Sequence, residues 1–408
     1  MKRVILFGAF DRHNAGDMLF AHVVARLLTQ RAPAIEIVFA GLAQRDLRNS
    51  GGHAVAALAE VAARWRDEPV TVIHAGGELL TCDAWQAAIM LTEPGETQRC
   101  IARHGMRESE RRAWARTKLG IDACAPYVIG HETFPHAASI VCNAVGGVKL
   151  ESLAPAMHGE VLDKLRGADA LAVRDAHTQT ALRLAGIEAR LIPDPVALIA
   201  ALFDERIQAH ANRGEVVAIQ SALPQGYLAV QFSADFGDDA TLARIARQLD
   251  RLAEVCGRGI VLFRAGAAPW HDDLAVYERT VRRMNCRTVK ILASLNVWDI
   301  CALIAKSEGY AGSSLHGRII AMAYGLPRMN MRHAEAEAEA EAEAEAEADK
   351  QRAYASTWDQ GNAGVELVEH LCDAMLEALK ADRETLAQHA ATLAQAYRQA
   401  FDDLTPRL

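Results

Sequence analysis

The sequence lacks the cysteine pairs that mark a zinc site, a dithiol redox motif or a disulfide scaffold. Its 408 residues contain eight cysteines, and no two of them form a C-x-x-C pair. Several of them, such as Cys142 and Cys301, stand beside apolar residues. The sequence therefore predicts buried free thiols, which are typical of proteins in a reducing cytoplasm.

Long hydrophobic runs are also lacking. The apolar N-terminal stretch ends at Asp11, and no small-residue cleavage site follows it. No segment approaches the roughly 18–20 apolar residues that a membrane-spanning helix needs. We expect a cytoplasmic protein without a transmembrane segment. Peripheral contact with the inner membrane stays open, although no amphipathic anchor is visible in the sequence.

An excess of positive charge is missing as well. The formal net charge is −8, which argues against a partner that exposes a phosphate backbone, and no nucleic acid is expected. A small anionic substrate needs only a local cluster of positive groups and stays open. With 51% hydrophobic and 24% charged residues, the chain is typical of a soluble globular protein, and it is too long for one core.

Strands and helices alternate along most of the chain, which predicts an α/β fold with mostly parallel sheets. The expected linker is the charged stretch 203–214, followed by a strand at 216–220. We therefore predict one lobe at residues 1–205 and a second at 206–380. A terminal helix within 381–408 is expected to brace both lobes.

Residues 334–348 form a strict Ala-Glu alternation. A period of two spreads the carboxylates around a helix, places glutamates four residues apart and leaves no apolar stripe for docking. A solvated helix or a disordered insertion outside both cores is the expected structure. A functional acidic segment is a weaker alternative.

Two polar motifs stand where a strand passes into a helix. They are Asn14-Ala-Gly-Asp17 near the start of the chain and Gly312-Ser-Ser-Leu-His316-Gly-Arg318 near residue 315. Such junctions expose backbone N–H groups and helix N-termini to ligands in open α/β sheets. Two of them suggest two lobes that face each other across a cleft.

Several motifs in a fixed order resemble the polysaccharide pyruvyl transferase family. After Asn14-x-Gly-Asp17 come His74-Ala-Gly-Gly77, Val173-Arg174-Asp175, Asp194-Pro195, and Ser314-Leu-His-Gly317 before Tyr324-Gly-Leu-Pro327. The resemblance implies a fold similar to GT-B glycosyltransferases, with two Rossmann-like lobes. It also implies transfer of a pyruvyl group from phosphoenolpyruvate to a sugar as a ketal, in envelope or exopolysaccharide synthesis.

The same resemblance implies that Arg174, Leu315 and His316 bind phosphoenolpyruvate. An arginine fork matches a carboxylate or a phosphate, and an anion is favoured at a helix N-terminus. A salt bridge is the structural alternative for Arg174, and a loop contact is the alternative for His316. His316 is also a candidate for proton transfer. Arg318 is a candidate phosphate contact or a helix-surface ion pair.

The remaining candidates lie in the first lobe. Asn14 and Asp17 are expected to orient a sugar hydroxyl, with Asp17 as a possible general base, although an isolated aspartate there more often caps the helix. His74 and Glu78 could line the same cleft. No redox cofactor or protein-bound metal is required, and Mg²⁺ bound through substrate phosphates stays open.

Two other functions fit the same motifs. One is a GT-B glycosyltransferase that uses a nucleotide sugar in place of pyruvyl transfer. In either case the saccharide acceptor could be lipid-linked or free. A catalytically silent relative that only binds a glycan is the other. Because fold does not fix function, the sequence leaves this choice to experiment.

Overall fold

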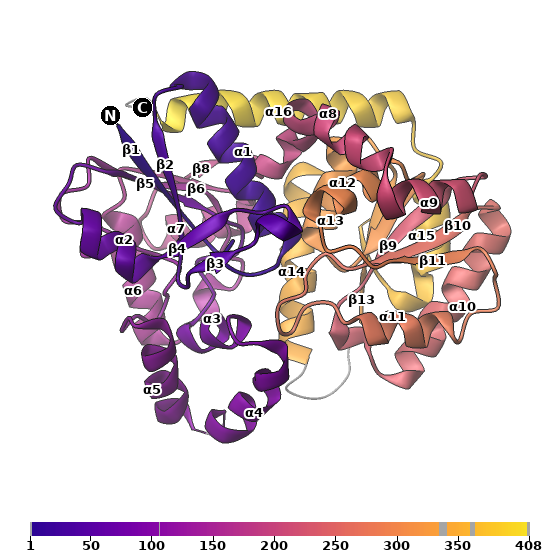
Figure 1. The fold of residues 1–408 in the computed structure, drawn as a ribbon, viewed down its shortest axis with the longest axis horizontal. Coiled ribbons are helices and arrows are strands. Elements are labelled where there is room, and N and C mark those ends of the chain that lie inside the picture. Colours follow the sequence, from indigo (N-terminus) through magenta and orange to yellow (C-terminus); the bar gives the residue numbers. More distant parts are fainter. Residues whose placement is uncertain (1, 106, 334–340, 360–363, 406–408) are drawn as a thin grey trace. The chain divides into compact units, whose positions relative to one another are not determined.

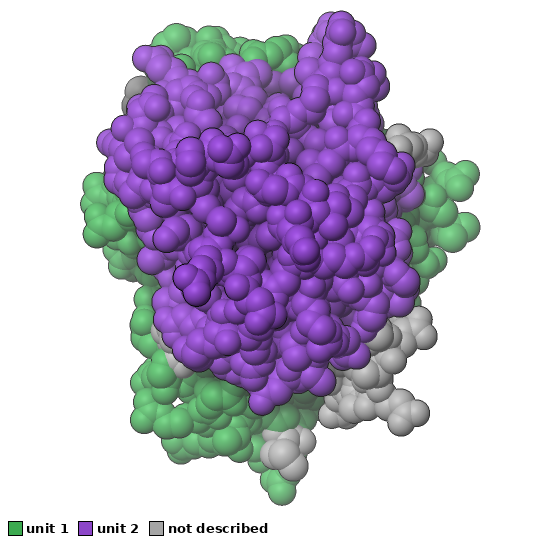
Figure 2. All heavy atoms as spheres, turned by 90° about the vertical axis from the view of Figure 1, so that its right-hand side faces the viewer, with its two compact units in different colours: residues 1–195, 396–408 green, residues 196–395 purple. Residues whose placement is uncertain are grey.

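The structure is a computed structural model that describes residues 2–405 except 106, 334–340 and 360–363. It divides into two compact units, residues 1–195 with 396–408 and residues 196–395 (Figure 2). The eight cysteines are all free thiols, and Cys142 and Cys301 are buried as the sequence predicts.

Unit 1 is built around an eight-stranded sheet in the order β3-β4-β2-β1-β5-β6-β7-β8, parallel except for the β3–β4 pair (Figure 1). Its strands are β1 (Arg3–Phe7), β2 (Glu36–Gly41), β3 (Arg45–Asp46), β4 (Ala54–Ala57), β5 (Thr71–Ala75), β6 (Ser139–Val145), β7 (Ala170–Val173) and β8 (Arg190–Leu191). Its helices are α1 (Ala15–Arg31), α2 (Leu58–Trp65), α3 (Ala84–Met90), α4 (Pro94–His104), α5 (Glu108–Leu119), α6 (Pro155–Arg166) and α7 (Ala176–Leu184). The central strands read as continuous apolar runs because helices cover both faces of the sheet.

Unit 2 holds a six-stranded parallel sheet in the order β11-β10-β9-β12-β13-β14. The strands are β9 (Tyr227–Gln231), β10 (Gly259–Phe263), β11 (Val289–Leu292), β12 (Gly309–Gly312), β13 (Arg328–Arg332) and β14 (Val365–Leu367). The helices are α8 (Ile199–Ala211), α9 (Gly214–Ala222), α10 (Asp239–Cys256), α11 (Leu274–Val281), α12 (Val297–Ala305), α13 (Leu315–Ala323), α14 (Glu341–Trp358), α15 (Leu371–Ala378) and α16 (Arg383–Leu404).

The predicted linker and the strand after it are wrong. Residues 203–214 lie mostly in α8, and residues 216–220 lie in α9, which packs against α8 and α12. The first strand of unit 2 is β9, which starts after the Gly226 turn at φ 88°. A short apolar run does not distinguish a buried helix from a strand, and here the tertiary contacts select the helix.

The sequence pattern of residues 127–130 favours a strand, but they do not form one. Residues 365–379 are expected to be helical throughout, but they contain β14 before α15 begins. The final residues of α16 belong to unit 1, where the Tyr397 hydroxyl exchanges hydrogen bonds with the Asn143 amide at 2.9 and 3.1 Å. The bracing role of α16 stays a prediction. In the described part of the chain, no helix is long and apolar enough to span a bilayer.

The Ala-Glu segment is described only from residue 341, as the first part of α14, and residues 334–340 lie outside the described residues. The later part of α14 is docked in unit 2. Gln351, Tyr354 and Asp359 are buried there, and the Gln351 side-chain amide donates to the Ser313 carbonyl. The described contacts of α14 with unit 2 therefore come from residues beyond the repeat.

Candidate active site

Both polar motifs lie at the point where strand order reverses in their sheet. In unit 1, β1 has β2 on one side and β5 on the other, and the first motif follows β1. In unit 2, β9 lies between β10 and β12, and the second motif follows β12. The carboxyl ends of parallel strands at such a switch point are where open α/β sheets bind ligands.

The start of α1 is capped by Asn14, not by Asp17. The Asn14 Oδ1 atom accepts the backbone N–H groups of Gly16 at 3.0 Å and Asp17 at 3.3 Å. The sequence interpretation that gave Asp17 the cap is therefore wrong. Asp17 lies in the first helical turn, where its carboxylate favours the positive end of the helix dipole.

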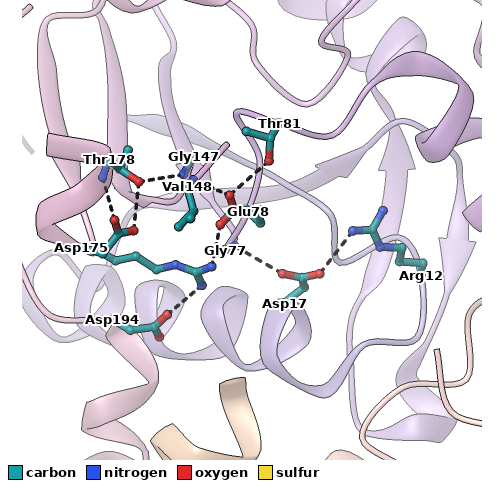
Figure 3. Close-up of polar contacts among 11 residues, drawn as sticks. Arg12, Asp17, Gly77, Glu78, Thr81, Gly147, Val148, Asp175, Thr178 and Asp194 are labelled. Carbon is teal, nitrogen blue, oxygen red and sulfur yellow. Dashed lines mark hydrogen bonds and ion pairs between the residues drawn. The ribbon is translucent and has the colours of Figure 1, made fainter. Parts of the chain in front are cut away.

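The Asp17 carboxylate links α1 to the loop after β5. Its Oδ1 atom accepts the Gly77 N–H at 3.3 Å, and its Oδ2 atom lies 3.6 Å from Arg12 Nη2 (Figure 3). Asp17 is only 5% exposed. Asp17 therefore lies at the switch point between β1 and β5, with the Arg12 guanidinium beside its carboxylate.

Arg174 follows β7 and lies between two carboxylates in a buried network. Its Nη2 atom lies 3.0 Å from Glu78 Oε2, and its Nη1 atom lies 3.4 Å from Asp194 Oδ2. Glu78 also accepts the Thr81 hydroxyl and the Val148 N–H (Figure 3). Asp175, the next residue in the chain, caps α7 by accepting the Thr178 N–H at 2.7 Å.

The electrostatics of this network keep Arg174 charged. Burial acts to lower its pKa, but the Glu78 and Asp194 carboxylates outweigh burial, so the pKa of Arg174 is raised. The salt-bridge alternative from the sequence analysis is therefore present, with Glu78 and Asp194 as partners. A donor-binding role for Arg174 stays a prediction.

The backbone at Gly146 lies in close contact with the Glu78–Arg174 pair. A Cβ atom on Gly146 would lie 2.5 Å from Glu78 Oε2 and 2.8 Å from Arg174 Nε. Ala144, two residues earlier, has a left-handed φ of 52°, at the register shift in β6. Backbone strain of this kind is held only where its surroundings enforce it, and it is common at functional sites. The Glu78–Arg174 pair thus requires a residue without a side chain at 146.

His74 lies in β5 and serves the packing of unit 1. Its Nδ1 atom lies 3.2 Å from the Val141 carbonyl, and its Nε2 atom accepts the Ile129 N–H at 3.1 Å. These contacts assign the proton to Nδ1. Burial lowers the pKa of His74 to about 4, so the ring is neutral at pH 7. Both nitrogens are engaged by the backbone, and we do not place His74 in the candidate site.

In unit 2, the second motif forms the start of α13. Ser314 caps the helix, and its hydroxyl oxygen accepts the Gly317 N–H at 3.2 Å. Leu315 and His316 are the first two helical residues, with Leu315 buried and His316 partly exposed. His316 thus stands in the first turn, where the helix dipole favours an anion.

Two glycines of this motif are required by Tyr310 in β12. A Cβ atom on Gly312 would lie 2.3 Å from the Tyr310 hydroxyl oxygen, and one on Gly317 would lie 2.5 Å from the Tyr310 ring. The Tyr310 hydroxyl donates to the Ser314 carbonyl at 3.0 Å. The Gly-x-x-x-x-Gly spacing therefore wraps the helix start around one buried tyrosine.

Gln231 and Asp272 hold the same helix start. Gln231, the last residue of β9, accepts the Ser314 N–H at 2.8 Å through Oε1 and donates from Nε2 to Asp272 Oδ1 at 2.8 Å. The Asp272 carboxylate also accepts the Ala265 N–H at 2.5 Å. Because the Gln231 Nε2 atom donates to Asp272, the Gln231 amide is held with its oxygen toward Ser314.

We predict that Asp272 makes stability depend on pH. Burial raises the pKa of Asp272 from 3.8 to about 7, against the lowering effect of its hydrogen bonds to Ala265 and Gln231. Between about pH 4 and pH 7 the unfolded chain loses this proton first, so the free energy of unfolding falls as pH rises. Because the side chain is partly exposed, we expect a fall of roughly 2–4 kcal/mol.

Urea denaturation at a series of pH values tests this expectation. Asp272→Asn should lack this part of the slope between pH 4 and pH 7. Asp273→Asn is the matched control, since exposed Asp273 caps α11 and asparagine caps equally well. Equal slopes in the parent and in Asp272→Asn would contradict the assignment.

Arg318 is not at the helix surface. Its Nε atom lies 2.8 Å and its Nη2 atom 2.6 Å from Asp359 Oδ2, and its Nη1 atom donates to Asn330 Oδ1 at 3.0 Å. Arg328 binds the same carboxylate, at 2.9 Å from Nε. The side chains of both arginines and of Asp359 are at most 1% exposed. The expectation of a surface ion pair is wrong, and the contacts of Arg318 are those of a core residue.

The sequence analysis missed Gln231, Asp272 and Asp359. Gln231 contacts Ser314 from 83 residues away, and Asp359 contacts Arg318 from 41 residues away. Asp272 acts through Gln231, and no spacing rule connects any of the three to the motif. A polar Gln directly after the apolar run Tyr-Leu-Ala-Val was the available signal for Gln231. Asp194, quoted only as part of a motif, proves to be a partner of Arg174.

Part of the chain matches a known protein family. Residues 138–333 match the model of the polysaccharide pyruvyl transferase family. The resemblance predicted from the sequence is confirmed. The matched segment includes Arg174, Asp194 and the whole Ser314–Gly317 motif, and it supports a transferase that modifies polysaccharides. No curated protein matches the chain in sequence.

Solved structures show the fold. The chain is similar to UDP-GlcNAc 2-epimerase from Neisseria meningitidis, with 12% identity, a TM-score of 0.52 and 100% of each chain covered. It is also similar to a putative UDP-N-acetylglucosamine 2-epimerase from Listeria monocytogenes, with 11% identity, a TM-score of 0.53, and 100% and 98% covered. UDP-GlcNAc 2-epimerase from Methanocaldococcus jannaschii is similar as well, with 11% identity and a TM-score of 0.51. The match covers 97% of this chain and 100% of that one. The predicted GT-B-like α/β fold class is therefore confirmed.

Proposed function

We propose that the protein transfers a pyruvyl group from phosphoenolpyruvate to a sugar of a glycan or glycan precursor and forms a ketal. The observation that carries this proposal is the Ser314-Leu-His-Gly317 motif at the switch point of unit 2, inside the segment that matches the pyruvyl transferase family. The role in envelope or exopolysaccharide synthesis, in the cytoplasm, belongs to the same proposal.

His316 and Leu315 are the proposed donor contacts in unit 2. Phosphoenolpyruvate carries a carboxylate and a phosphate, and a histidine in the first turn of α13 adds an N–H donor to the positive end of the helix. Ser314 and Gly317 are held by their cap bond, and Gln231 fixes the Ser314 N–H. The helix start is therefore preorganised for an anion rather than ordered by it.

The proposed reaction is addition to the enol C=C bond of phosphoenolpyruvate, without attack at phosphorus. A general acid donates a proton to C3 of phosphoenolpyruvate, and C2 becomes the electrophilic centre. One sugar hydroxyl forms a C–O bond to C2 and gives its proton to a base. A second hydroxyl then forms the other C–O bond as the C2–O bond to phosphate breaks. Its proton passes to the leaving phosphate, which is released as inorganic phosphate.

Asp17 is the proposed base for a sugar hydroxyl, and His316 is the proposed acid. The Asp17 carboxylate is buried at the switch point of unit 1 and accepts only one described backbone N–H, from Gly77. Asn14 and Glu78 support this edge of the sheet, Asn14 by capping α1 and Glu78 through Thr81 and Val148. We assign the acceptor to unit 1 and the donor to unit 2.

Calorimetric titration with phosphoenolpyruvate and, separately, with UDP-N-acetylglucosamine tests the proposal. We expect phosphoenolpyruvate to bind and inorganic phosphate to appear once a saccharide acceptor is supplied. Binding of the nucleotide sugar alone would instead support a glycosyltransferase. Binding of a glycan with no turnover of either donor would indicate a silent relative.

A further inference from the structure

Arg12 carries an unusual pair of unsatisfied donors. Its Nε and Nη1 atoms are both buried and have no hydrogen-bond partner among the residues that the structure describes. The Arg12 side chain is 10% exposed. Most buried polar groups in folded proteins are hydrogen-bonded, so two unsatisfied donors on one guanidinium call for an explanation.

Among the arginines that the structure describes, Arg12 is the one with two buried unsatisfied nitrogens, whereas Arg244, Arg264 and Arg332 each leave Nε alone unsatisfied. The fully buried arginines are satisfied by carboxylates. Arg174 lies against Glu78 and Asp194, and Arg318 and Arg328 share Asp359. Arg12 has one ion pair, from Nη2 to Asp17 at 3.6 Å, and its guanidinium carbon lies 5.3 Å from the Tyr127 ring centroid. Those contacts hold the guanidinium in place without using Nε or Nη1.

The location of Arg12 is that of a ligand site. It stands between the end of β1 and the start of α1, at the switch point of the unit 1 sheet. Figure 3 shows it on the opposite side of Asp17 from Glu78 and Asp194. The carboxyl end of β1 is where an open sheet receives an anionic group, close to the positive end of α1.

The surrounding charges leave Arg12 positive. Burial acts to lower its pKa, but Tyr127, Cys82 and the carboxylates of Asp17 and Asp11 outweigh burial, so the pKa of Arg12 is raised. Asp11 is occupied elsewhere, since it accepts the Leu42 N–H at 2.6 Å and the Tyr127 hydroxyl at 2.9 Å. Among the residues that the structure describes, Asp17 is the carboxylate within ion-pair distance of Arg12, and it reaches Nη2.

We propose that Arg12 binds a carboxylate or phosphate group of a substrate through Nε and Nη1. An ionised oxygen is the acceptor that suits a desolvated guanidinium best. The group could belong to phosphoenolpyruvate or to a phosphorylated sugar acceptor. The inference concerns anion binding by unit 1 and holds whether or not the protein transfers a pyruvyl group.

Calorimetry on Arg12→Met and Arg12→Lys tests the proposal with three probes: inorganic phosphate, phosphoenolpyruvate and glucose 1-phosphate. Loss of a charge-assisted bond weakens binding about tenfold to hundredfold, and we expect this loss for at least one probe in Arg12→Met. A loss with phosphoenolpyruvate alone assigns the donor anion, and a loss with glucose 1-phosphate alone assigns the acceptor anion. Arg12→Lys keeps the charge beside Asp17 but removes the fork, so it should weaken binding less.

Arg3→Met is the matched control. Arg3 lies at the other end of β1, where Glu36 and Glu68 already satisfy its guanidinium, and the variant should bind every probe as the parent does. Parental affinity of Arg12→Met for all three probes would overturn the proposal. If Arg12→Met does not fold, parental affinity of Arg12→Lys would overturn it, as would a folded parent that binds none of the probes.

Discussion

Asp359→Ala is expected to lower the free energy of unfolding by about 3–5 kcal/mol. Asp359 is the shared counter-ion of Arg318 and Arg328, and all three side chains are at most 1% exposed. Burial acts to lower the pKa of Arg318, and Asp359 opposes that effect. Without the carboxylate, two guanidinium groups would stay buried and uncompensated, side by side.

Urea denaturation of the full chain, followed by tryptophan fluorescence, measures this loss. Asp349→Ala is the matched control, in α14 itself, whose last residue directly precedes Asp359. Asp349 pairs with Arg352 three residues on, with side chains 30% and 44% exposed, and its removal should cost less than about 1 kcal/mol. An Asp359→Ala variant as stable as the control would show that Arg318 and Arg328 do not depend on this carboxylate.

Arg174→Ala is expected to lose a similar amount of stability, about 3–5 kcal/mol, in addition to any effect on ligand binding. The Glu78 and Asp194 side chains are 13% and 0% exposed and would lose their common positive partner. A matching change on the acidic side should relieve the loss. Glu78→Gln in the Arg174→Ala background is therefore expected to recover part of it.

Thermal or urea denaturation of the single and double variants measures the coupling. Arg166→Ala is the control in unit 1, because Arg166 pairs with Asp163 at the surface with side chains 51% and 78% exposed. A stable Arg174→Ala variant would contradict the buried network. The practical consequence is that weaker donor binding by Arg174→Ala cannot be interpreted alone, because the variant also perturbs folding.

The sequence predicted the elements whose pattern is local. The apolar runs at 3–10, 70–74 and 259–263 predict strands, and they correspond to β1, β5 and β10. The helical patterns at 17–30 and 241–256 correspond to α1 and α10. These segments carry their own periodicity, so neighbouring residues suffice to identify them. The α/β class and the two strand-to-helix motifs followed from the same local signals.

The errors came from residues whose state depends on distant partners. Residues 216–220 form a helix because α8 and α12 pack against them. Arg318 was expected at the surface because nothing near it in sequence reveals Asp359, which binds it from 41 residues away. Asp17 was weighed as the cap of α1, whereas Asn14 is the cap and accepts the Gly16 and Asp17 N–H groups. Burial and ion pairing of this kind are tertiary properties, and a single sequence does not contain them in a readable form.

The central claim is that the start of α13 binds phosphoenolpyruvate through His316. Calorimetric titration of phosphoenolpyruvate into the parent, His316→Ala and His370→Ala tests it directly. His370 is an exposed histidine of unit 2 outside the motif, which makes it a matched control. We expect the parent and His370→Ala to bind alike, and His316→Ala to bind at least tenfold more weakly while folding as the parent does. Equal affinity in all three folded proteins, or a parent that binds no phosphoenolpyruvate, would contradict the account.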